Sequence, residues 1–229
     1  FNALVEATQD EMEQALVNVK KIYFGGEGAS LIHVRQAFDQ LGPDRLINLY
    51  GPTEGTVVAT YYPVNSKEGI SSGVPIGKPI SNTQIHILNK HLQLQPPGAW
   101  GELTISGPGI AAGYLNRPKL TAEKFIENPF TGEKMYKTGD LARWLDDGNI
   151  EFGGRIDQQV QIRGFRIEPG EIEGCLLEHD SIKEAVVIDL DYQGNKYLVA
   201  YYSELPDNQR ELTVEELKEY LSQSLPDYM

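Results

Sequence analysis

The sequence predicts an α/β layer, followed by a β-rich region and a small α+β unit. Three patterns along the 229 residues support this prediction. Apolar strand runs first alternate with helical patterns, short strands with turns rich in Gly, Pro and Asn begin near residue 73, and a mixed pattern follows residue 154. We therefore expect an α/β subdomain over residues 1–74, a barrel-like subdomain or small sheet over 75–156, and an α+β subdomain over 157–229.

The first region alternates helical and strand patterns. Residues 8–21 predict a helix, because TQDE is a capping box with Thr8 as the cap and Glu11 three residues later. A strand, a helix and a second strand are expected next, at IYF, LIHVRQAFDQ and LINLY. The last run is mainly apolar, as in strands that are buried in parallel sheets. This order indicates a βα-type layer that is truncated on its N-terminal side.

The second region contains four short strand runs that are separated by turn residues. These runs are TQIHILN, GELTISG, KMYKTGDLARW and NIEFGG. The DDGN turn between the last two predicts a β-hairpin. Short strands at this spacing indicate a small barrel or a small sheet.

The third region predicts a compact unit that begins near Asp157. QVQIRGFRIE predicts a hairpin that turns at Gly164, and IKEAVVIDL and KYLVAYYS predict two strands on either side of a QGN turn. PGEIEGCLLEH predicts a helix with Pro169 at its first position. LTVEELKEYLSQSL predicts another, with Thr213 as the cap and Glu216 at the N3 position.

Composition and charge exclude several classes of protein. The formal net charge of −13 argues against a surface for nucleic acid or anionic membranes, since both need clustered Lys and Arg. No run approaches the ~20 apolar residues of a membrane span, and the first residues lack the pattern of a signal peptide. The one cysteine, Cys175, excludes an internal disulfide, and its apolar-spaced surroundings indicate a core thiol. We expect a cytoplasmic protein, and the opening run FNALVEA indicates a segment of a longer chain.

Polar residues follow both predicted strands of the first region. LINLY ends at Tyr50, and after a Gly-Pro turn the chain presents Thr53 and Glu54. Ligands of α/β sheets bind at the carboxyl ends of strands. Thr53 could hydrogen-bond a phosphate oxygen, Glu54 could hold Mg²⁺, and Tyr50 offers a flat face for a base. A plain strand-to-loop turn with a solvated Glu explains the same residues equally well.

The strand IYF also ends in a polar loop, Gly25-Gly26-Glu27. Paired glycines let the backbone come close to a planar ligand, but they also simply form turns. Two neighbouring strand ends with such loops point to a site more strongly than one.

Two further groups could bind a sugar or a phosphate. Asp140 follows a Thr-Gly turn, and a fixed carboxylate can accept hydrogen bonds from both hydroxyls of a ribose, although an Asp in this position can also cap the turn. Arg155, Arg163 and Arg166 could grip ribose or phosphate oxygens bidentately, or form the solvated face of a hairpin.

Five blocks occur in order and with natural spacing: YGPTEGT, GELTISGPGIAAGYLNRP, YKTGDL, GGRIDQQVQIRGFRIEPGEIE and LPDYM. Together they resemble the adenylate-forming superfamily, and specifically the amino-acid adenylation domains of non-ribosomal peptide synthetases. The resemblance runs across nearly the whole chain, whereas any single block would be unspecific. The chain would be the C-terminal portion of such a domain, with an incomplete and mobile C-terminal subdomain.

The resemblance implies a role for each candidate residue. Tyr50 would stack on adenine, Thr53 would touch the α-phosphate, Glu54 would hold Mg²⁺, and Asp140 would bind the ribose hydroxyls. The residues expected to bind the nucleotide are Gly25, Gly26, Glu27, Tyr50, Thr53, Asp140, Phe152 and Arg155. Those expected to line the amino-acid pocket are Tyr23, Gly25, Leu49, Val57 and Val58. The pocket residues are mostly apolar, which indicates an apolar or aromatic substrate side chain.

The resemblance also implies a two-step reaction. The carboxylate of an amino acid attacks the α-phosphorus of ATP, giving aminoacyl-AMP and pyrophosphate, and a phosphopantetheine thiol on a partner carrier domain then takes the aminoacyl group. Asp157 would be the hinge about which the C-terminal subdomain swings, and the swing would bring the segment around Gly164 into the site for the thioester step. The implied cofactors are ATP and Mg²⁺, and a small MbtH-like helper is a further implied partner.

The chain departs from the family pattern in several places. The phosphate loop that would precede Phe1 and the lysine segment that would follow Met229 are absent, Gln161 stands where lysine is common, and Ala112 stands where arginine is common. Since removing one charge-stabilising donor can lower turnover by ~10²–10³, we expect the isolated chain to be inactive. Two alternatives stay open: an acyl- or aryl-CoA ligase of the same superfamily, and a non-catalytic protein that binds nucleotide or a carrier.

Overall fold

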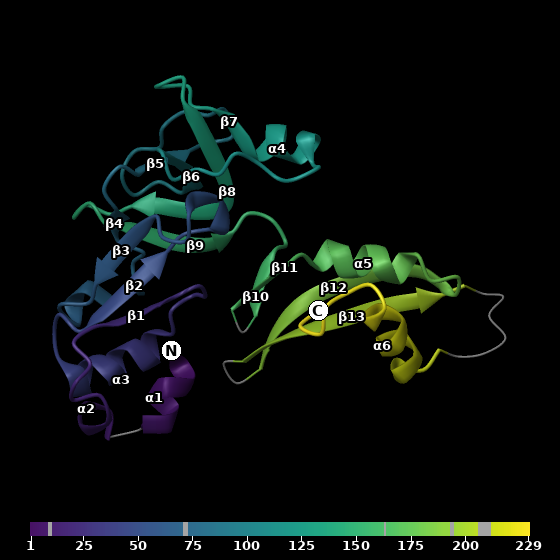
Figure 1. The fold of residues 1–229 in the computed structure, drawn as a ribbon, viewed down its shortest axis with the longest axis horizontal. Coiled ribbons are helices and arrows are strands. Elements are labelled where there is room, and N and C mark those ends of the chain that lie inside the picture. Colours follow the sequence, from purple (N-terminus) through teal and green to yellow (C-terminus); the bar gives the residue numbers. More distant parts are fainter. Residues whose placement is uncertain (9–10, 71–72, 163, 193–194, 206–211) are drawn as a thin grey trace. The chain divides into compact units, whose positions relative to one another are not determined.

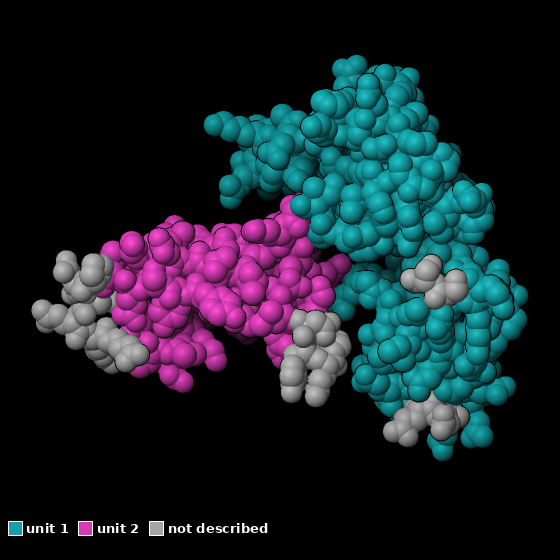
Figure 2. Space-filling model, turned by 180° about the vertical axis from the view of Figure 1, so that it is seen from behind, with its two compact units in different colours: residues 1–156 teal, residues 157–229 magenta. Residues whose placement is uncertain are grey.

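The computed structural model describes the chain except residues 9–10, 71–72, 163, 193–194 and 206–211. The chain divides into two compact units, residues 1–156 and residues 157–229, which Figure 2 distinguishes by colour. Each unit has its own buried apolar clusters, as independent folding units require. The further division of the first unit at residue 74, and the mobility of the second, stay predictions.

Four strands form the first sheet, in the order β1-β2-β3-β4 (Figure 1). Their bounds are Ile22–Gly25, Leu46–Tyr50, Thr60–Pro63 and Lys78–Pro79. β1 and β2 are parallel, as the mainly apolar run LINLY predicts, and β3 and β4 join in antiparallel pairs. Helix α3 (Leu31–Leu41) connects the parallel strands and buries Val34 and Leu41 against Phe24 and Leu46. The predicted βα layer is confirmed.

The predicted helix over residues 8–21 is wrong. The chain instead forms two short helices, α1 (Asn2–Thr8) and α2 (Met12–Ala15). Thr8 ends α1, and its hydroxyl donates to the Leu4 carbonyl at 2.8 Å rather than capping a following helix. The two residues between Thr8 and Glu11 in the expected capping box, Gln9 and Asp10, lie outside the described residues. Val5 and Met12 are both buried in the core of this layer, so packing decides where the helices lie.

Five strands form the second sheet, with β5, β6, β8 and β7 in that order and β9 paired with β8. Their bounds, from β5 to β9, are Gln84–Leu88, Gly101–Ser106, Phe125–Glu127, Lys134–Trp144 and Ile150–Arg155. All pairs are antiparallel, and in the described part of the chain no pairing closes the sheet into a barrel. The DDGN hairpin is confirmed, because Leu145 N donates to the Asn149 carbonyl at 2.8 Å.

Among the described residues of the first unit, three short helices connect strands. They are η2 (Thr53–Gly55), η3 (Glu68–Ile70) and α4 (Pro118–Lys124). The first two are 3₁₀ helices, and only Gly51 and Pro52 separate η2 from the end of β2. The segment that carries Thr53 and Glu54 is therefore an ordered turn.

The second unit matches its predicted elements closely. They are β10 (Val160–Ile162), β11 (Phe165–Ile167), α5 (Pro169–Leu177), β12 (Ile182–Tyr192), β13 (Asn195–Glu204) and α6 (Val214–Ser222). Thr213 and Glu216 form the predicted capping box of α6. The QGN turn falls on Gln193 and Gly194, outside the described residues. Ile167, Ile172 and Leu176 form the centre of the core of this unit.

The single cysteine is buried in the second unit. Cys175 is a free thiol with 8% of its surface exposed, so it is the predicted core thiol. Within the described ranges, no helix has the length and apolar character that crossing a membrane requires.

Candidate functional site

The carboxyl ends of β1 and β2 lie side by side, because Gly25 of β1 pairs with Leu49 of β2. The two backbones approach closely at this point. A Cβ atom on Gly25 would lie 2.0 Å from the Leu49 carbonyl oxygen, and Gly25 has a φ of 157°. Only glycine fits such a contact. The edge of the sheet therefore carries the exposed Gly25-Gly26-Glu27 loop next to the strand that ends at Tyr50.

Tyr50, Asp140 and Arg155 form one hydrogen-bonded cluster, although they come from three strands. Asp140 in β8 pairs directly with Arg155 in β9, and Arg155 Nη1 donates to Asp140 Oδ1 at 2.8 Å. The Tyr50 hydroxyl donates to the other carboxylate oxygen, Oδ2. Asp140 is 6% exposed. The carboxylate is thus fixed from both sides, by a guanidinium and by a neutral hydroxyl.

Thr138 and the β8 backbone hold this carboxylate in place. The Thr138 hydroxyl accepts from Asp140 N at 2.9 Å and donates to the Leu103 carbonyl at 2.7 Å. Arg155 Nη1 also donates to the Thr138 carbonyl at 2.7 Å. A group held in this way costs little to orient when it binds a ligand, since its geometry exists beforehand.

An aromatic pair joins the cluster through Tyr50. The rings of Tyr50 and Phe152 have centroids 6.2 Å apart and are tilted by 40°. Burial, and then the neighbouring Asp140 charge, raise the pKa of Tyr50 well above its ordinary value of 10.0. Tyr50 therefore stays a neutral donor at physiological pH. An acidic acceptor next to flat apolar faces suits a ligand that joins hydroxyl groups to a planar ring.

Glu54 lies in η2 and is only 8% exposed. Its carboxylate accepts a hydrogen bond at Oε1 from the Tyr114 hydroxyl at 2.5 Å. Burial is the largest cause of a raised pKa at Tyr114, and the hydrogen bond to Glu54 adds to it. Tyr114 is therefore also a neutral donor. The hydroxyl thus orients the carboxylate without placing a positive charge beside it.

Whether Glu54 suits Mg²⁺ depends on the oxygen ligands that the ion would find beside it. Mg²⁺ in nucleotide sites takes one or two carboxylates and completes its shell with phosphate oxygens and water. Within the described residues, no group of three or more His, Cys, Asp or Glu side chains could form a metal site by itself. Glu54 fits a Mg²⁺ ion that binds together with phosphates.

The predicted amino-acid pocket residues differ widely in exposure. Tyr23 in β1 and Val57 are 61% and 72% exposed, while Leu49 and Val58 are partly buried. Thr53 is exposed at the start of η2. Val57 has a φ of 68°, which is strained for a β-branched residue. Leu49 pairs with Gly25 at the sheet edge, and Val57 and Val58 follow η2.

The candidate residues of the second unit lie on and before its first hairpin. The Asp157 carboxylate accepts from Gln159 N at 3.2 Å, and Gly164, with a φ of 82°, lies in the turn between β10 and β11. Arg166 Nε donates to Gln159 Oε1 at 2.6 Å, so it takes part in a local network. Arg163 lies outside the described residues.

Sequence reasoning gave no role to two residues that the structure joins to the site. They are Thr138, which bonds to Asp140, and Tyr114, which bonds to Glu54. Both lie inside the blocks YKTGDL and GPGIAAGYLNRP, so the blocks were the available signal. The partner of Tyr114 is 60 residues away in the sequence, and the bond from Asp140 N to Thr138 requires a particular side-chain rotamer. A sequence pattern specifies neither.

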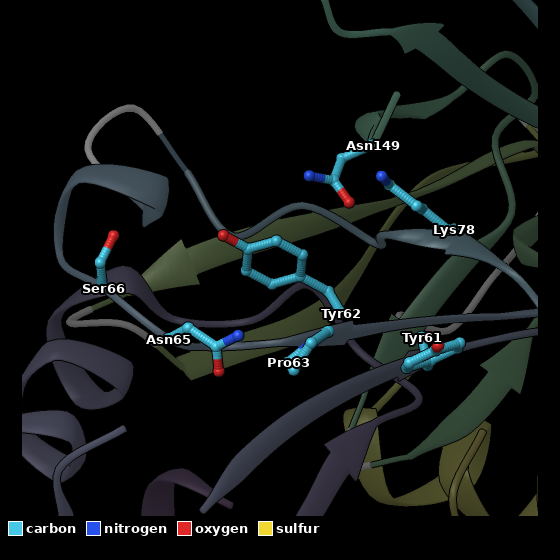
Figure 3. A pocket seen from close by; sticks show the side chains of 7 residues that line it. All are labelled: Tyr61, Tyr62, Pro63, Asn65, Ser66, Lys78 and Asn149. Carbon is cyan, nitrogen blue, oxygen red and sulfur yellow. The ribbon is translucent and has the colours of Figure 1, made fainter. Parts of the chain in front are cut away.

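A separate hollow lies between the first sheet and the DDGN hairpin (Figure 3). Its volume is about 340 Å³, and its lining residues are Tyr61, Tyr62, Pro63, Asn65, Ser66, Lys78 and Asn149. The Tyr62 hydroxyl donates to the Gly69 carbonyl at 3.0 Å. None of the lining residues is a predicted site residue, so the hollow is not part of the cluster around Asp140 and Glu54.

Comparisons with known proteins agree with the geometry. The family model described as "AMP-binding enzyme" matches residues 1–115. Surfactin synthase subunit 1 of Bacillus subtilis (strain 168) is 50% identical over 99% of this chain, and tyrocidine synthase 1 of Brevibacillus parabrevis is 51% identical over 94%. This chain spans 6% and 19% of the lengths of these two relatives.

A solved structure is similar over the whole chain. It is an artificially fused adenylation–PCP di-domain NRPS, NpsA-ThdA, from Klebsiella oxytoca. The TM-score is 0.81 at 29% identity, and the match covers 100% of this chain and 42% of that one. The fold is therefore that of an adenylation domain.

Proposed function

Because the chain belongs to the AMP-binding enzyme family, we propose that it is part of an amino-acid adenylation domain of a non-ribosomal peptide synthetase. The domain activates an amino acid with ATP. The amino-acid carboxylate attacks the α-phosphorus, an aminoacyl-AMP forms, and pyrophosphate leaves. The relatives named as synthases of surfactin and tyrocidine, at about half identity, support this proposal over other members of the family.

The cluster of Tyr50, Asp140, Arg155 and Phe152 is the observation that carries the proposal. Asp140 is held by Arg155 and Tyr50, and it can accept hydrogen bonds from the two ribose hydroxyls of ATP. Tyr50 and Phe152 provide faces for the adenine and the sugar. The loop Gly25-Gly26-Glu27, on the neighbouring strand end, lies along the edge of the base.

The phosphates and the metal are assigned to η2. Thr53 donates its hydroxyl to an α-phosphate oxygen, and Glu54 holds the Mg²⁺ that enters with ATP. When bound, Mg²⁺ would supply positive charge against the phosphates, and Glu54 would be the residue that holds it. The contribution of these residues is to hold the phosphates in position, since phosphoryl chemistry depends mainly on positioning and charge.

The substrate is an amino acid whose side chain meets Tyr23, Gly25, Leu49, Val57 and Val58. Exposed apolar side chains at Tyr23 and Val57 favour an apolar or aromatic substrate, because such a residue would cover them on binding.

The second unit acts in the transfer step. The carrier partner presents a phosphopantetheine thiol, which attacks the aminoacyl carbonyl and releases AMP. Asp157 is the hinge, because it is the first residue of the second unit, and Gly164 is in the hairpin turn that this unit presents to the thiol. The similarity to an adenylation–PCP di-domain protein supports a carrier partner. A small MbtH-like helper and a cytoplasmic location belong to the same proposal.

ATP–pyrophosphate exchange tests the proposal. The full-length protein that contains this chain is assayed against a panel of amino acids, with Asp140→Ala measured beside it. We expect exchange with one amino acid or a small apolar set, and loss of that exchange in the variant. If Asp140→Ala kept full exchange, the ribose assignment would be wrong.

The same assay separates the alternatives. Exchange with an acyl or aryl carboxylic acid, and with no amino acid, would indicate a CoA ligase. Nucleotide binding without any exchange would indicate a non-catalytic protein, an alternative that rests on Gln161 in β10.

A further inference from the structure

Tyr114 contacts the carboxylate that the proposed function assigns to Mg²⁺. Its hydroxyl donates to Glu54 Oε1 at 2.5 Å and lies 3.4 Å from the Tyr136 hydroxyl. Glu54 is 8% exposed and Tyr136 is fully buried. The carboxylate therefore meets Tyr114 inside the protein, where a hydrogen bond restricts its rotamer more than it would on the surface.

Tyr114 is itself held in a fixed position. Its ring packs edge-on against Phe125, with centroids 5.4 Å apart. Its backbone N donates to Thr121 Oγ1 of α4 at 2.9 Å. A Cβ atom on the preceding Gly113 would lie 2.4 Å from Thr121 Cγ2, so glycine is needed for α4 to approach this segment. The hydroxyl is thus presented by a rigid support.

The segment that carries Tyr114 also holds the backbone around Glu54. Ala111 N donates to the Glu54 carbonyl at 2.9 Å, and Thr56 Oγ1 donates to the Gly109 carbonyl at 2.5 Å. Residues 109–114 therefore contact both the main chain and the side chain of η2. Such double support fixes the position and the direction of one carboxylate.

We propose that Tyr114 is a positioning residue that orients Glu54 toward the Mg²⁺ ion of bound nucleotide. The inference rests on the proposed function, in which Glu54 is the metal carboxylate. Mg²⁺ demands nearly ideal octahedral geometry at about 2.0–2.1 Å, so it tolerates little freedom in its ligand. A neutral hydroxyl suits this task, because it fixes the carboxylate without cancelling the charge that attracts the metal.

The test measures metal-dependent nucleotide binding and does not depend on turnover. Calorimetry gives the affinity of the full-length protein for a non-hydrolysable ATP analogue, once with Mg²⁺ and once with EDTA. The affinity with Mg²⁺ divided by the affinity with EDTA is the gain from the metal. Tyr114→Phe keeps the ring against Phe125 and removes only the hydroxyl. Because loss of a hydrogen-bonding partner to a metal ligand typically costs about 10–100-fold, we expect the gain to fall about tenfold, with the EDTA affinity unchanged.

Tyr62→Phe is the matched control, because its hydroxyl bonds to the Gly69 carbonyl away from the site. It should keep the wild-type gain. A double variant of Tyr114→Phe with Glu54→Gln should lose no more of the gain than Glu54→Gln alone, since both act through one carboxylate. Thermal melting confirms that each variant is folded.

Each outcome bears on the inference. The inference is overturned if Tyr114→Phe keeps the full gain from the metal. It is also overturned if the variant loses affinity for the ATP analogue equally with Mg²⁺ and with EDTA. If the wild type exchanges pyrophosphate but gains nothing from Mg²⁺, the metal assignment of Glu54 fails, and the inference falls with it. If the wild type does not exchange with any amino acid but still shows the gain and its loss in the variant, the inference survives and the proposed reaction does not.

Discussion

Replacing Asp140 by Asn separates the structural from the ligand-binding role of this carboxylate. Asp140 accepts hydrogen bonds from Tyr50 and from Arg155, and its side chain is 9% exposed. A hydrogen bond to a charged group contributes about 1.5–3 kcal/mol. Asn keeps one acceptor oxygen and replaces the other with a donor. The variant should therefore lose the contribution of one such bond, about 1.5–3 kcal/mol, from the free energy of unfolding.

The effect on ATP follows from the same reasoning. If the carboxylate accepts from both ribose hydroxyls, Asn can accept from one, and the loss of about 1.5–3 kcal/mol weakens binding by about 10- to 150-fold. Calorimetry measures ATP affinity, and urea unfolding measures stability in the same preparation. An Asn variant that is destabilised but binds ATP as tightly as the wild type would refute the ribose assignment.

The neighbouring pair on the same two strands gives the control. Arg143 Nε and Glu151 Oε2 also join β8 and β9, at 2.6 Å, but these side chains are 34% and 23% exposed. Glu151→Gln should cost less stability, because exposed pairs contribute about 0–1 kcal/mol, and it should leave ATP affinity unchanged. A loss of ATP binding in both variants would mean that the β8–β9 ladder, and not Asp140, determines the affinity.

Three further predictions concern stability. Gly25→Ala should cost more than about 1 kcal/mol in urea unfolding, because its Cβ would lie 2.0 Å from the Leu49 carbonyl oxygen; an unchanged unfolding midpoint would contradict this. Burial and the Asp140 charge raise the pKa of Tyr50, so the stability from its neutral form is fully present below pH 10 and falls as pH rises above that value. Between pH 8 and 11 the free energy of unfolding should therefore fall more in the wild type than in Tyr50→Phe. Parallel pH profiles of the two proteins would contradict this prediction. Thr213→Ala should destabilise the second unit by about 0.5–2 kcal/mol, because it removes the cap of α6, and hydrogen exchange of that helix measures the loss.

The sequence determined those elements whose signals are local. The DDGN turn, the apolar LINLY strand and the Thr213–Glu216 capping box each specify a structure over a few adjacent residues, and each was predicted and found. The order of helices and strands followed from such signals. The family followed from five ordered blocks, since blocks record which residue types occur at each point of the chain.

The tertiary structure decided what depends on partners that are distant in sequence. The helix predicted over residues 8–21 became two short helices, because burial of Val5 and Met12 outweighed a local capping pattern. Hydrogen bonds from Tyr50 to Asp140 and from Tyr114 to Glu54 join residues that only the folded sheets bring together. A sequence pattern names the carboxylates of a site, but their orientation depends on neighbours that packing supplies.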